Sequence, residues 1–133
     1  MEKKYIWLIL GIIIILGIIL VFRGFNGGED NWIKDNKGLW IKHGNPKNTP
    51  EKVKIQQDAL NCANSLYNNA KNTGMEFNSQ CLGTCKDYSI DIVHVPKNSE
   101  DNLAENQCSD FRDRITKYFI ELDKDGNVVR VVD

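Results

Sequence analysis

The sequence predicts an α+β protein in which an amino-terminal transmembrane helix precedes a small domain with one main helix packed on an antiparallel sheet. Three observations support this fold class. An unbroken apolar run covers residues 5–22, one long amphipathic pattern covers residues 50–72, and short β-rich segments bounded by turn residues lie on both sides of that pattern. Strands before and after a single helix are typical of α+β domains.

The apolar run reads YIWLILGIIIILGIILVF and contains no charged or amide side chain. As a helix with a rise of about 1.5 Å per residue it spans roughly 27 Å, close to the hydrocarbon thickness of a bilayer. A cleaved signal peptide is the alternative, but its apolar core is usually about 7 to 15 residues long and ends at a small-residue cleavage site. Residues 22–28 offer only a poor site of that kind, so we expect a retained anchor.

The charges beside the run indicate its orientation. Lys3 and Lys4 precede it and Arg23 follows it, which favours a cytoplasmic amino terminus. We therefore expect a single-pass protein of the cell membrane with an amino-terminal flank at 1–4, a transmembrane helix at 5–22, a linker at 23–31 and an extracytoplasmic domain at 32–133.

Two hairpins are expected, and they share the turn pattern Asp-x-x-Gly, at Asp35–Gly38 and at Asp123–Gly126. The aspartate side chain accepts a hydrogen bond from the turn, and the glycine adopts the positive φ that closes it. Their strands are rich in β-branched and aromatic residues. We expect these strands at residues 32–34, 39–42, 118–122 and 128–132.

The main helix has recognisable signals at both ends. Thr49 is expected to cap it, Pro50 suits its first position, Glu51 lies in the first turn, and Gly74 follows its end. At 100° per residue its apolar residues form one broad arc, which Gln56 interrupts. The residues of the arc are Ile55, Ala59, Leu60, Cys62, Ala63, Leu66, Tyr67 and Ala70.

The remaining segments are shorter. Residues 88–95 form the clearest strand pattern, which Pro96 ends. Residues 81–85 are interpreted as a compact segment that returns the chain toward the helix, and residues 75–77 as a short strand or a loop. Residues 97–107 are polar without an apolar period, which favours a long surface loop, and residues 109–114 are expected to form a helical turn.

The expected domain contains four cysteines, and the apolar run contains none. An even number of cysteines in a small domain behind an export-type segment indicates two disulfides in an oxidising compartment. Three pairings are possible, and the sequence does not choose among them. The cysteines are Cys62, Cys81, Cys85 and Cys108.

A zinc-binding or thiol-redox role for these cysteines is the alternative. Cys81 and Cys85 are separated by three residues, whereas thioredoxin-type pairs are separated by two and lie at the start of a helix. Zinc would take Cys81, Cys85 and Cys108 with either Cys62 or His94 as ligands. A zinc motif normally repeats a close cysteine pair, and this chain has one such pair, so the disulfide interpretation is preferred.

No set of residues predicts catalysis, because no nucleophile, base and orienting group come together. We therefore expect no enzymatic activity, no cofactor and no bound metal. His94 is expected to be partly buried with a hydrogen-bond partner, and His43 to be exposed. Asp91, Glu121 and Arg130 are expected to meet on the solvent face of the sheet as surface ion pairs.

Trp32 and Trp40 are the candidate binding residues, because tryptophan is favoured where proteins interact, although either ring could belong to the core. The net charge of −1 argues against a nucleic-acid partner. The expected partners are the bilayer, through residues 5–22, and other envelope or membrane proteins. The sequence thus predicts a membrane-anchored domain with a binding, assembly or envelope role.

Overall fold

The computed structural model describes Tyr5, residues 11–19 and residues 30–133 of the chain. The described residues at 11–19 are helical, while much of the expected transmembrane helix and most of the expected linker lie outside the described residues. Among the residues that are described, no helix is both long enough and apolar enough to cross a membrane.

The chain divides into two compact units. One comprises Trp32–Ile41 and Asn48–Asp133 and contains the features discussed below. The other includes residues 42–47, where the Asp30 carboxylate accepts a hydrogen bond from the Asn45 N–H at 2.9 Å. His43 lies in this second unit and is exposed, as the sequence predicted.

The strands form two sheets. Strands β1 (Asn31–Lys34) and β2 (Trp40–His43) make a two-stranded sheet. A four-stranded sheet has the order β3-β4-β5-β6. Its strands are β3 (Gln80–Cys85), β4 (Tyr88–Ile92), β5 (Tyr118–Leu122) and β6 (Val128–Val132).

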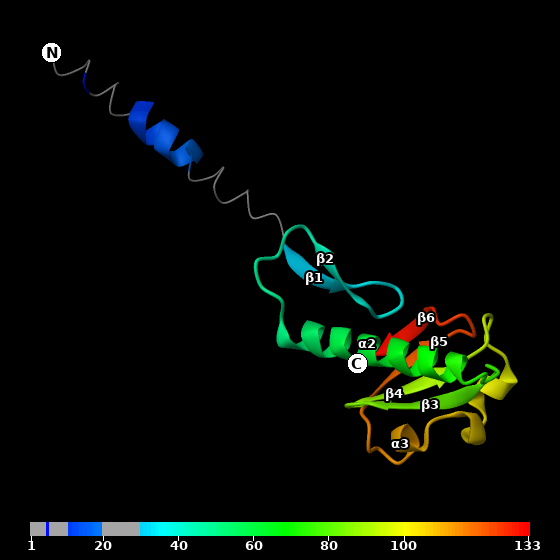
Figure 1. The fold of residues 1–133 in the computed structure, drawn as a ribbon. Coiled ribbons are helices and arrows are strands. Elements are labelled where there is room, and N and C mark those ends of the chain that lie inside the picture. Colours follow the sequence, from blue (N-terminus) through cyan, green and yellow to red (C-terminus); the bar gives the residue numbers. More distant parts are fainter. Residues whose placement is uncertain (1–4, 6–10, 20–29) are drawn as a thin grey trace. The chain divides into compact units, whose positions relative to one another are not determined.

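The main helix, α2 (Glu51–Asn72), packs on one face of the four-stranded sheet (Figure 1). This confirms the α+β class with one main helix packed on a sheet. The side chains that meet between helix and sheet alternate along the strands, as the period of two requires. The buried core contains Ala59, Ala63, Tyr67, Cys85, Tyr88, Ile90, Ile92, Ile120, Leu122 and Val131.

The expected all-antiparallel sheet is wrong at its centre, because β4 and β5 run parallel, with Tyr88 opposite Tyr118 and Ile92 opposite Leu122. The outer pairs, β3–β4 and β5–β6, are antiparallel. A parallel pair requires a long crossover, and residues 93–117 provide it. This crossover contains the 3₁₀ helices η1 (Ser99–Asn102) and η2 (Ala104–Asn106) and the short helix α3 (Ser109–Arg112).

Residues 81–85 do return the chain to the helix, since Cys85 is bonded to Cys62 of α2. The interpretation of these residues as a compact segment is wrong, because they lie in the edge strand β3. This strand carries a bulge between Cys81 and Gly83, where its register with β4 shifts by one residue. Cys81 lies opposite Asp91, and Cys85 lies opposite Tyr88. Because residues directly opposite each other share a face of the sheet, the bulge places the two cysteines on opposite faces.

The start of α2 differs from the expectation in one residue. Pro50 is the N-cap, and Thr49 makes no capping hydrogen bond because it lies one residue too early. The Pro50 carbonyl instead accepts from the N–H groups of Val53 and Lys54 at 3.0 and 3.3 Å. At the other end Gly74 has a φ of 78° and follows the helix, as predicted.

Both Asp-x-x-Gly turns are confirmed. The Asp35 carboxylate accepts from the N–H groups of Lys37 and Leu39, and the Asp123 carboxylate accepts from those of Asp125 and Asn127. The helical turn at residues 109–112 is also confirmed, whereas residues 75–77 form a loop.

Candidate functional site

Gln56 joins three parts of the domain at a buried position. Its side chain is 1 % exposed. Its Oε1 accepts from the Trp40 N–H at 2.8 Å, and its Nε2 donates to the Gly38 carbonyl and to the Asp133 carboxylate at 2.9 and 3.0 Å. The polar residue that interrupts the apolar arc of α2 therefore connects the helix to the first hairpin and to the residue after β6.

Asp133 collects further hydrogen bonds at the same place. Its carboxylate accepts from the Tyr88 hydroxyl at 2.9 Å and forms an ion pair with Lys34. Burial alone would raise the pKa of Asp133, but the hydrogen bonds from Lys34, Tyr88 and Gln56 outweigh it and hold the pKa below its usual value. Asp133 is therefore a carboxylate whose charge is already matched by Lys34.

A cleft of about 240 Å³ opens beside this cluster, and we call it the Trp40 cleft. Three aromatic rings and an isoleucine form most of its wall, and charged side chains complete it. Its lining residues are Lys34, Trp40, Lys52, Ile55, Tyr88, Tyr118 and Asp133. The rings of Tyr88 and Tyr118 lie with their centroids 5.1 Å apart.

Two ammonium groups lie over the half-buried Trp40 ring. The Lys52 Nζ is 4.1 Å from the ring centroid and the Lys34 Nζ is 5.1 Å from it, which are cation–π distances. Lys34 is paired with Asp133, whereas no carboxylate within the described part of the chain lies within ion-pair distance of Lys52. The Trp40 Nε1–H is shielded from solvent and has no acceptor among the described residues.

The two tryptophans that the sequence indicated as binding residues lie in different environments. Trp32 is 8 % exposed, and its Nε1 donates to the Asn48 carbonyl at 3.0 Å. Trp40 lines the cleft. Lys52 and Asp133 complete the cleft, and the sequence reasoning missed both because nothing in their local pattern indicates proximity to Trp40.

The four cysteines form two disulfides, which confirms the number that the sequence predicted and supplies the pairing. Cys62–Cys85 joins α2 to β3 on the helix face, with a Cα–Cα distance of 5.9 Å. Cys81–Cys108 joins β3 to the residue before α3, with a Cα–Cα distance of 4.7 Å. Each face of the sheet therefore carries one crosslink.

A second cleft, of about 210 Å³, lies on the sheet face that carries Cys81, and we call it the Asp91 cleft. Its lining residues are Asp91, Ile92, Val93, Lys97, Asp101, Asn102, Asn106, Gln107, Phe111, Phe119, Glu121 and Arg130. The prediction that Asp91 and Glu121 lie on the solvent face of the sheet is wrong, because they are only 9 % and 6 % exposed.

The two acids of this cleft differ in their partners. Glu121 accepts from Lys97 at 2.6 Å and from Arg130 at 3.0 and 3.1 Å, so its charge is matched. Burial raises the pKa of the Asp91 carboxyl, the hydrogen bond from the Cys108 N–H opposes this rise, and the Glu121 charge adds to it. The resulting pKa is about 6. Asp91 therefore titrates near neutral pH while Glu121 is ion-paired.

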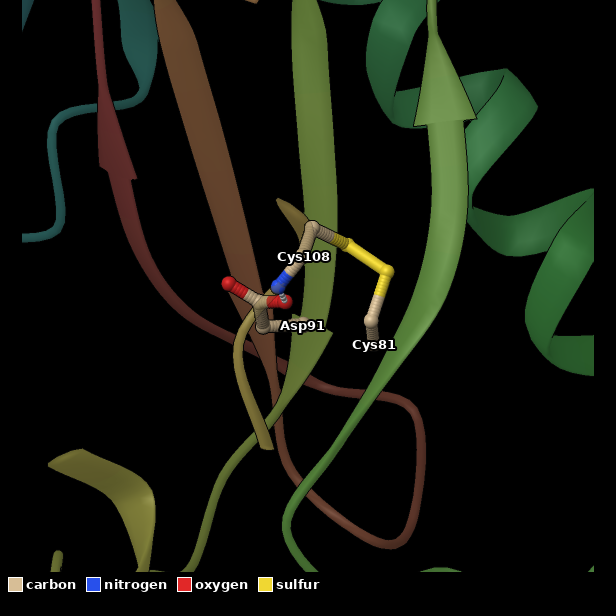
Figure 2. Close-up of side chains that lie close together, drawn as sticks. All are labelled: Cys81, Asp91 and Cys108. Atoms are coloured by element: carbon tan, nitrogen blue, oxygen red, sulfur yellow. Dashed lines mark hydrogen bonds between the residues drawn. A yellow bond between two sulfur atoms is a disulfide. The ribbon is translucent and has the colours of Figure 1, made fainter. Parts of the chain in front are cut away.

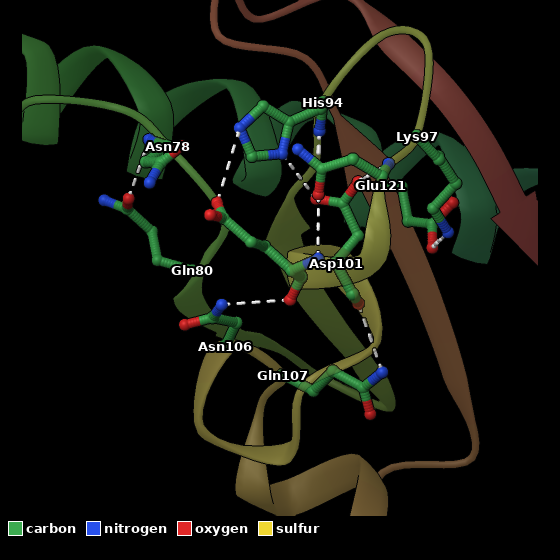
Figure 3. A network of polar contacts seen from close by, with 10 residues as sticks. Asn78, Gln80, His94, Lys97, Asp101, Asn106, Gln107 and Glu121 are labelled. Atoms are coloured by element: carbon green, nitrogen blue, oxygen red, sulfur yellow. Dashed lines mark hydrogen bonds and ion pairs between the residues drawn. The ribbon is translucent and has the colours of Figure 1, made fainter.

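A polar network lies around η1, beside the Asp91 cleft that Asp101 lines (Figure 3). The Asp101 carboxylate accepts from the N–H groups of His94 and Asn98, and the His94 ring nitrogen Nδ1 lies 3.0 Å from it. Burial would raise the pKa of Asp101, but these hydrogen bonds hold it below its usual value. The expectation of a partly buried, hydrogen-bonded His94 is confirmed. The expected surface loop is instead anchored by Asp101, which is 4 % exposed.

One group of metal-type ligands lies close together in the described part of the chain: Cys81, Asp91 and Cys108, with ligand atoms within 4.8 Å of one another (Figure 2). Both cysteines are in a disulfide, and zinc binds thiolates. The zinc alternative therefore requires reduction of this bond.

No family model matches the chain, and the searches of curated proteins and of solved structures found no significant match. The two clefts and the two disulfides are therefore the features from which a function can be inferred.

Proposed function

We propose that the protein is a membrane-anchored extracytoplasmic domain that binds an acidic segment of a neighbouring envelope or membrane protein through the Trp40 cleft. The main support for this proposal is the position of the Lys52 ammonium, which lies beside the aromatic cleft, 4.1 Å from the Trp40 ring centroid. Among the described residues this ammonium has no carboxylate partner.

The size and lining of the Trp40 cleft favour one side chain of a larger partner. Pockets for whole small molecules usually measure about 300–1,000 Å³, and this cleft measures about 240 Å³. Its aromatic and aliphatic wall suits an apolar side chain, since burial gains roughly 25 cal/mol per Å² of apolar surface removed from water. The occupant is therefore an apolar residue within a polypeptide segment.

The charges beside the cleft favour acidic flanking residues on that segment. Lys34 is matched by Asp133, whereas Lys52 has no carboxylate partner among the described residues, so a further carboxylate would pair with Lys52. The contact with Trp40 limits the positions of the ammonium, which lowers the entropy lost when a carboxylate binds. Charge complementarity of this kind gives specificity more than affinity.

The location of the domain rests on the sequence. The apolar run at residues 5–22 is long enough to cross a bilayer, and two disulfides suit an oxidising compartment. A domain tethered close to the bilayer meets other membrane and envelope proteins first. The alternative, a metal-binding accessory role, requires at least one of the two disulfides to be reduced.

A peptide titration of the full-length protein in detergent tests the binding proposal. The probe is an acetylated and amidated tripeptide with phenylalanine between two aspartates, and the readout is the Trp40 indole N–H resonance, assigned with Trp40→Phe. We expect saturable shifts of this resonance, and a loss of affinity of about fivefold or more in Lys52→Glu, since an ion pair contributes about 1 kcal/mol.

Lys54→Glu is the matched control, because Lys54 lies on the same helix, is exposed, and among the described residues pairs only with Glu51, at 3.7 Å. We expect this variant to bind the tripeptide as the unchanged protein does. Equal losses in both lysine variants, or unchanged binding in Lys52→Glu, would contradict the assignment of the cleft.

A protease-protection experiment tests the location independently. Proteinase added to intact cells is expected to digest the domain while a cytoplasmic marker stays intact. Digestion only after the cells are broken open would exclude the extracytoplasmic placement, whatever the outcome of the peptide titration.

A further inference from the structure

The Cys81–Cys108 disulfide is asymmetric in its accessibility. Cys81 is exposed, whereas Cys108 is 1 % exposed. A thiolate attacks a disulfide along the line of the S–S bond, at the sulfur it can reach. Attack from solvent therefore falls on Cys81, and the Cys108 sulfur is the leaving group. The other disulfide lies on the helix face, where Cys62 is half-buried and Cys85 is 2 % exposed.

A buried carboxyl group lies beside the leaving sulfur. The oxygen of Asp91 and the sulfur atoms of Cys81 and Cys108 lie within 4.8 Å of one another. The Asp91 carboxylate also accepts from the Cys108 N–H at 3.0 Å (Figure 2), which holds it at this place. The bulge in β3 creates the arrangement, because it brings Cys81 opposite Asp91.

The surroundings of the Cys108 sulfur suit a thiol and oppose a thiolate. The carbonyl oxygens of Ile90 and Gly83 lie 3.4 and 3.5 Å from it. A disulfide sulfur has no proton to donate, but a thiol S–H would donate to either carbonyl. A buried thiolate facing two carbonyl oxygens is costly, so the departing sulfur needs a proton at once.

We propose that Cys81–Cys108 is a thiol–disulfide exchange site, at which an external dithiol attacks Cys81 and the Asp91 carboxyl gives a proton to the departing Cys108 sulfur.

The atoms and electrons balance in two steps. The dithiol's thiolate forms a bond to the Cys81 sulfur, the Cys81–Cys108 bond breaks, and Cys108 leaves as a thiol with the proton of Asp91. The second thiol of the reductant, as a thiolate, then attacks the mixed disulfide, and Cys81 leaves as a thiolate that takes a proton from solvent. The protein gains two electrons, the dithiol becomes a disulfide, and Asp91 is reprotonated by the proton that the reductant released.

The titration of Asp91 occurs among other charged groups. Glu121 on β5 faces it and favours its protonated form, and Lys97, after β4, opposes that effect. Arg130 on β6 pairs with Glu121. Asp101 on η1 lines the same cleft, and Asp110 on α3 hydrogen-bonds Thr84 of β3 at 2.7 Å. The pKa of Asp91 is about 6. Below that pH its carboxyl group is protonated and can donate the proton, whereas above that pH it is a carboxylate that repels a leaving thiolate.

The test measures the reduction of both disulfides in one sample of the full-length protein. Dithiothreitol is added between pH 5 and 8, aliquots are quenched with acid and alkylated, and peptide mass spectrometry gives the rate for each bond. The ratio of the Cys81–Cys108 rate to the Cys62–Cys85 rate cancels the thiolate concentration of the reagent. We expect a ratio above ten at pH 5 that falls at least fivefold as the pH passes through about 6.

The Asp91→Asn variant is expected to show a ratio that is independent of pH within twofold, because an amide keeps the acceptor for the Cys108 N–H but carries no proton to give. A wild-type ratio that does not change with pH, or a variant that keeps the wild-type pH profile, would overturn the role of Asp91.

A measurement on the unchanged protein covers the case in which the variant does not fold. With glutathione as the probe, the mixed disulfide is expected on Cys81 and not on Cys108. Glutathione on Cys108, or equal rates for the two disulfides, would overturn the proposed exchange site. These measurements do not involve the Trp40 cleft. A negative result would therefore contradict the exchange site without bearing on the proposal that the Trp40 cleft binds an acidic segment.

Discussion

At the scale of single residues, Gln56 is the polar group on which the contact between α2 and the first hairpin depends. It satisfies the Trp40 N–H, the Gly38 carbonyl and the Asp133 carboxylate from one buried side chain. A buried donor or acceptor left without its partner costs more than a typical hydrogen bond contributes.

Gln56→Ala is expected to lower the free energy of unfolding by about 2–4 kcal/mol, since it leaves several partners unsatisfied in a buried setting. Gln57→Ala is the matched control, because Gln57 is the neighbouring glutamine and is exposed; its effect should stay within about 0.5 kcal/mol. Denaturant unfolding gives both values, and equal effects would show that the buried network contributes nothing measurable.

Asp91 gives the domain a distinctive pH dependence. Folding raises the pKa of this carboxyl from 3.8 to about 6, so between these values the folded protein binds more protons here than the unfolded chain. The contribution of Asp91 to the free energy of unfolding therefore falls as the pH rises from about 4 to about 6, and is constant beyond.

Asp91→Asn removes this contribution. Relative to the unchanged protein, the variant is expected to gain about 2–3 kcal/mol in the free energy of unfolding between pH 4 and pH 7, since one pKa unit corresponds to about 1.4 kcal/mol. Denaturant titrations of both proteins at the two pH values measure the change. A constant difference between them would mean that folding does not perturb Asp91.

At the scale of elements, the first hairpin is held against β6 through its turn. The Val131 N–H donates to the Lys37 carbonyl at 2.7 Å, and a Cβ on Gly38 would collide with the backbone oxygen of Val131. Gly38 also has a φ of 84°. The glycine is therefore required both by the turn and by the close approach of the two segments.

Gly38→Ala is expected to destabilise the protein by about 3 kcal/mol or more, because backbone strain of about 1–2 kcal/mol adds to a clash that the backbone must relieve. Gly74→Ala separates the two effects, because Gly74 has a φ of 78° but open space around its Cα. It should cost only about 1–2 kcal/mol. Thermal or chemical unfolding compares the variants, and equal costs would show that the contact with β6 is not tight.

The elements with strong local signals could be predicted from the sequence. The helix period, the Asp-x-x-Gly turns and the β-branched strands each depend on residues close together in the chain. Strand β3 was missed because it contains a glycine, two cysteines and a bulge in place of an alternating apolar pattern. The parallel pairing was missed because it depends on the path of residues 93–117, which no local pattern records.

The candidate sites were predicted less completely, because they are assembled by contacts distant in sequence. Trp40 was singled out, but its cleft also needs Lys34 beside Asp133, residues that are separated by 99 positions. Asp91 was expected on a solvent face because its strand alternates. Residues 93–117, the crossover that buries Asp91, are polar and show no apolar pattern that would predict packing against the sheet.

At the scale of the whole molecule, we propose a membrane anchor that holds an oxidised domain with a cleft for an acidic partner. The disulfides and the access to an envelope partner both require that the domain lie outside the cytoplasm. Two disulfides in a domain of this size persist where the surroundings are oxidising, and each one typically contributes about 2–4 kcal/mol. A reduced domain would lose that stabilisation and would acquire thiols that bind metal.

The redox state of Cys62 and Cys85 in living cells shows whether the domain lies in an oxidising compartment, on which the extracytoplasmic placement depends. Intact cells are quenched with acid, free thiols are alkylated, and the remaining disulfides are reduced and labelled with a second reagent before mass spectrometry. An extracytoplasmic domain predicts that both cysteines carry only the second label. If both instead carry the first label, the domain faces a reducing compartment and the account is contradicted.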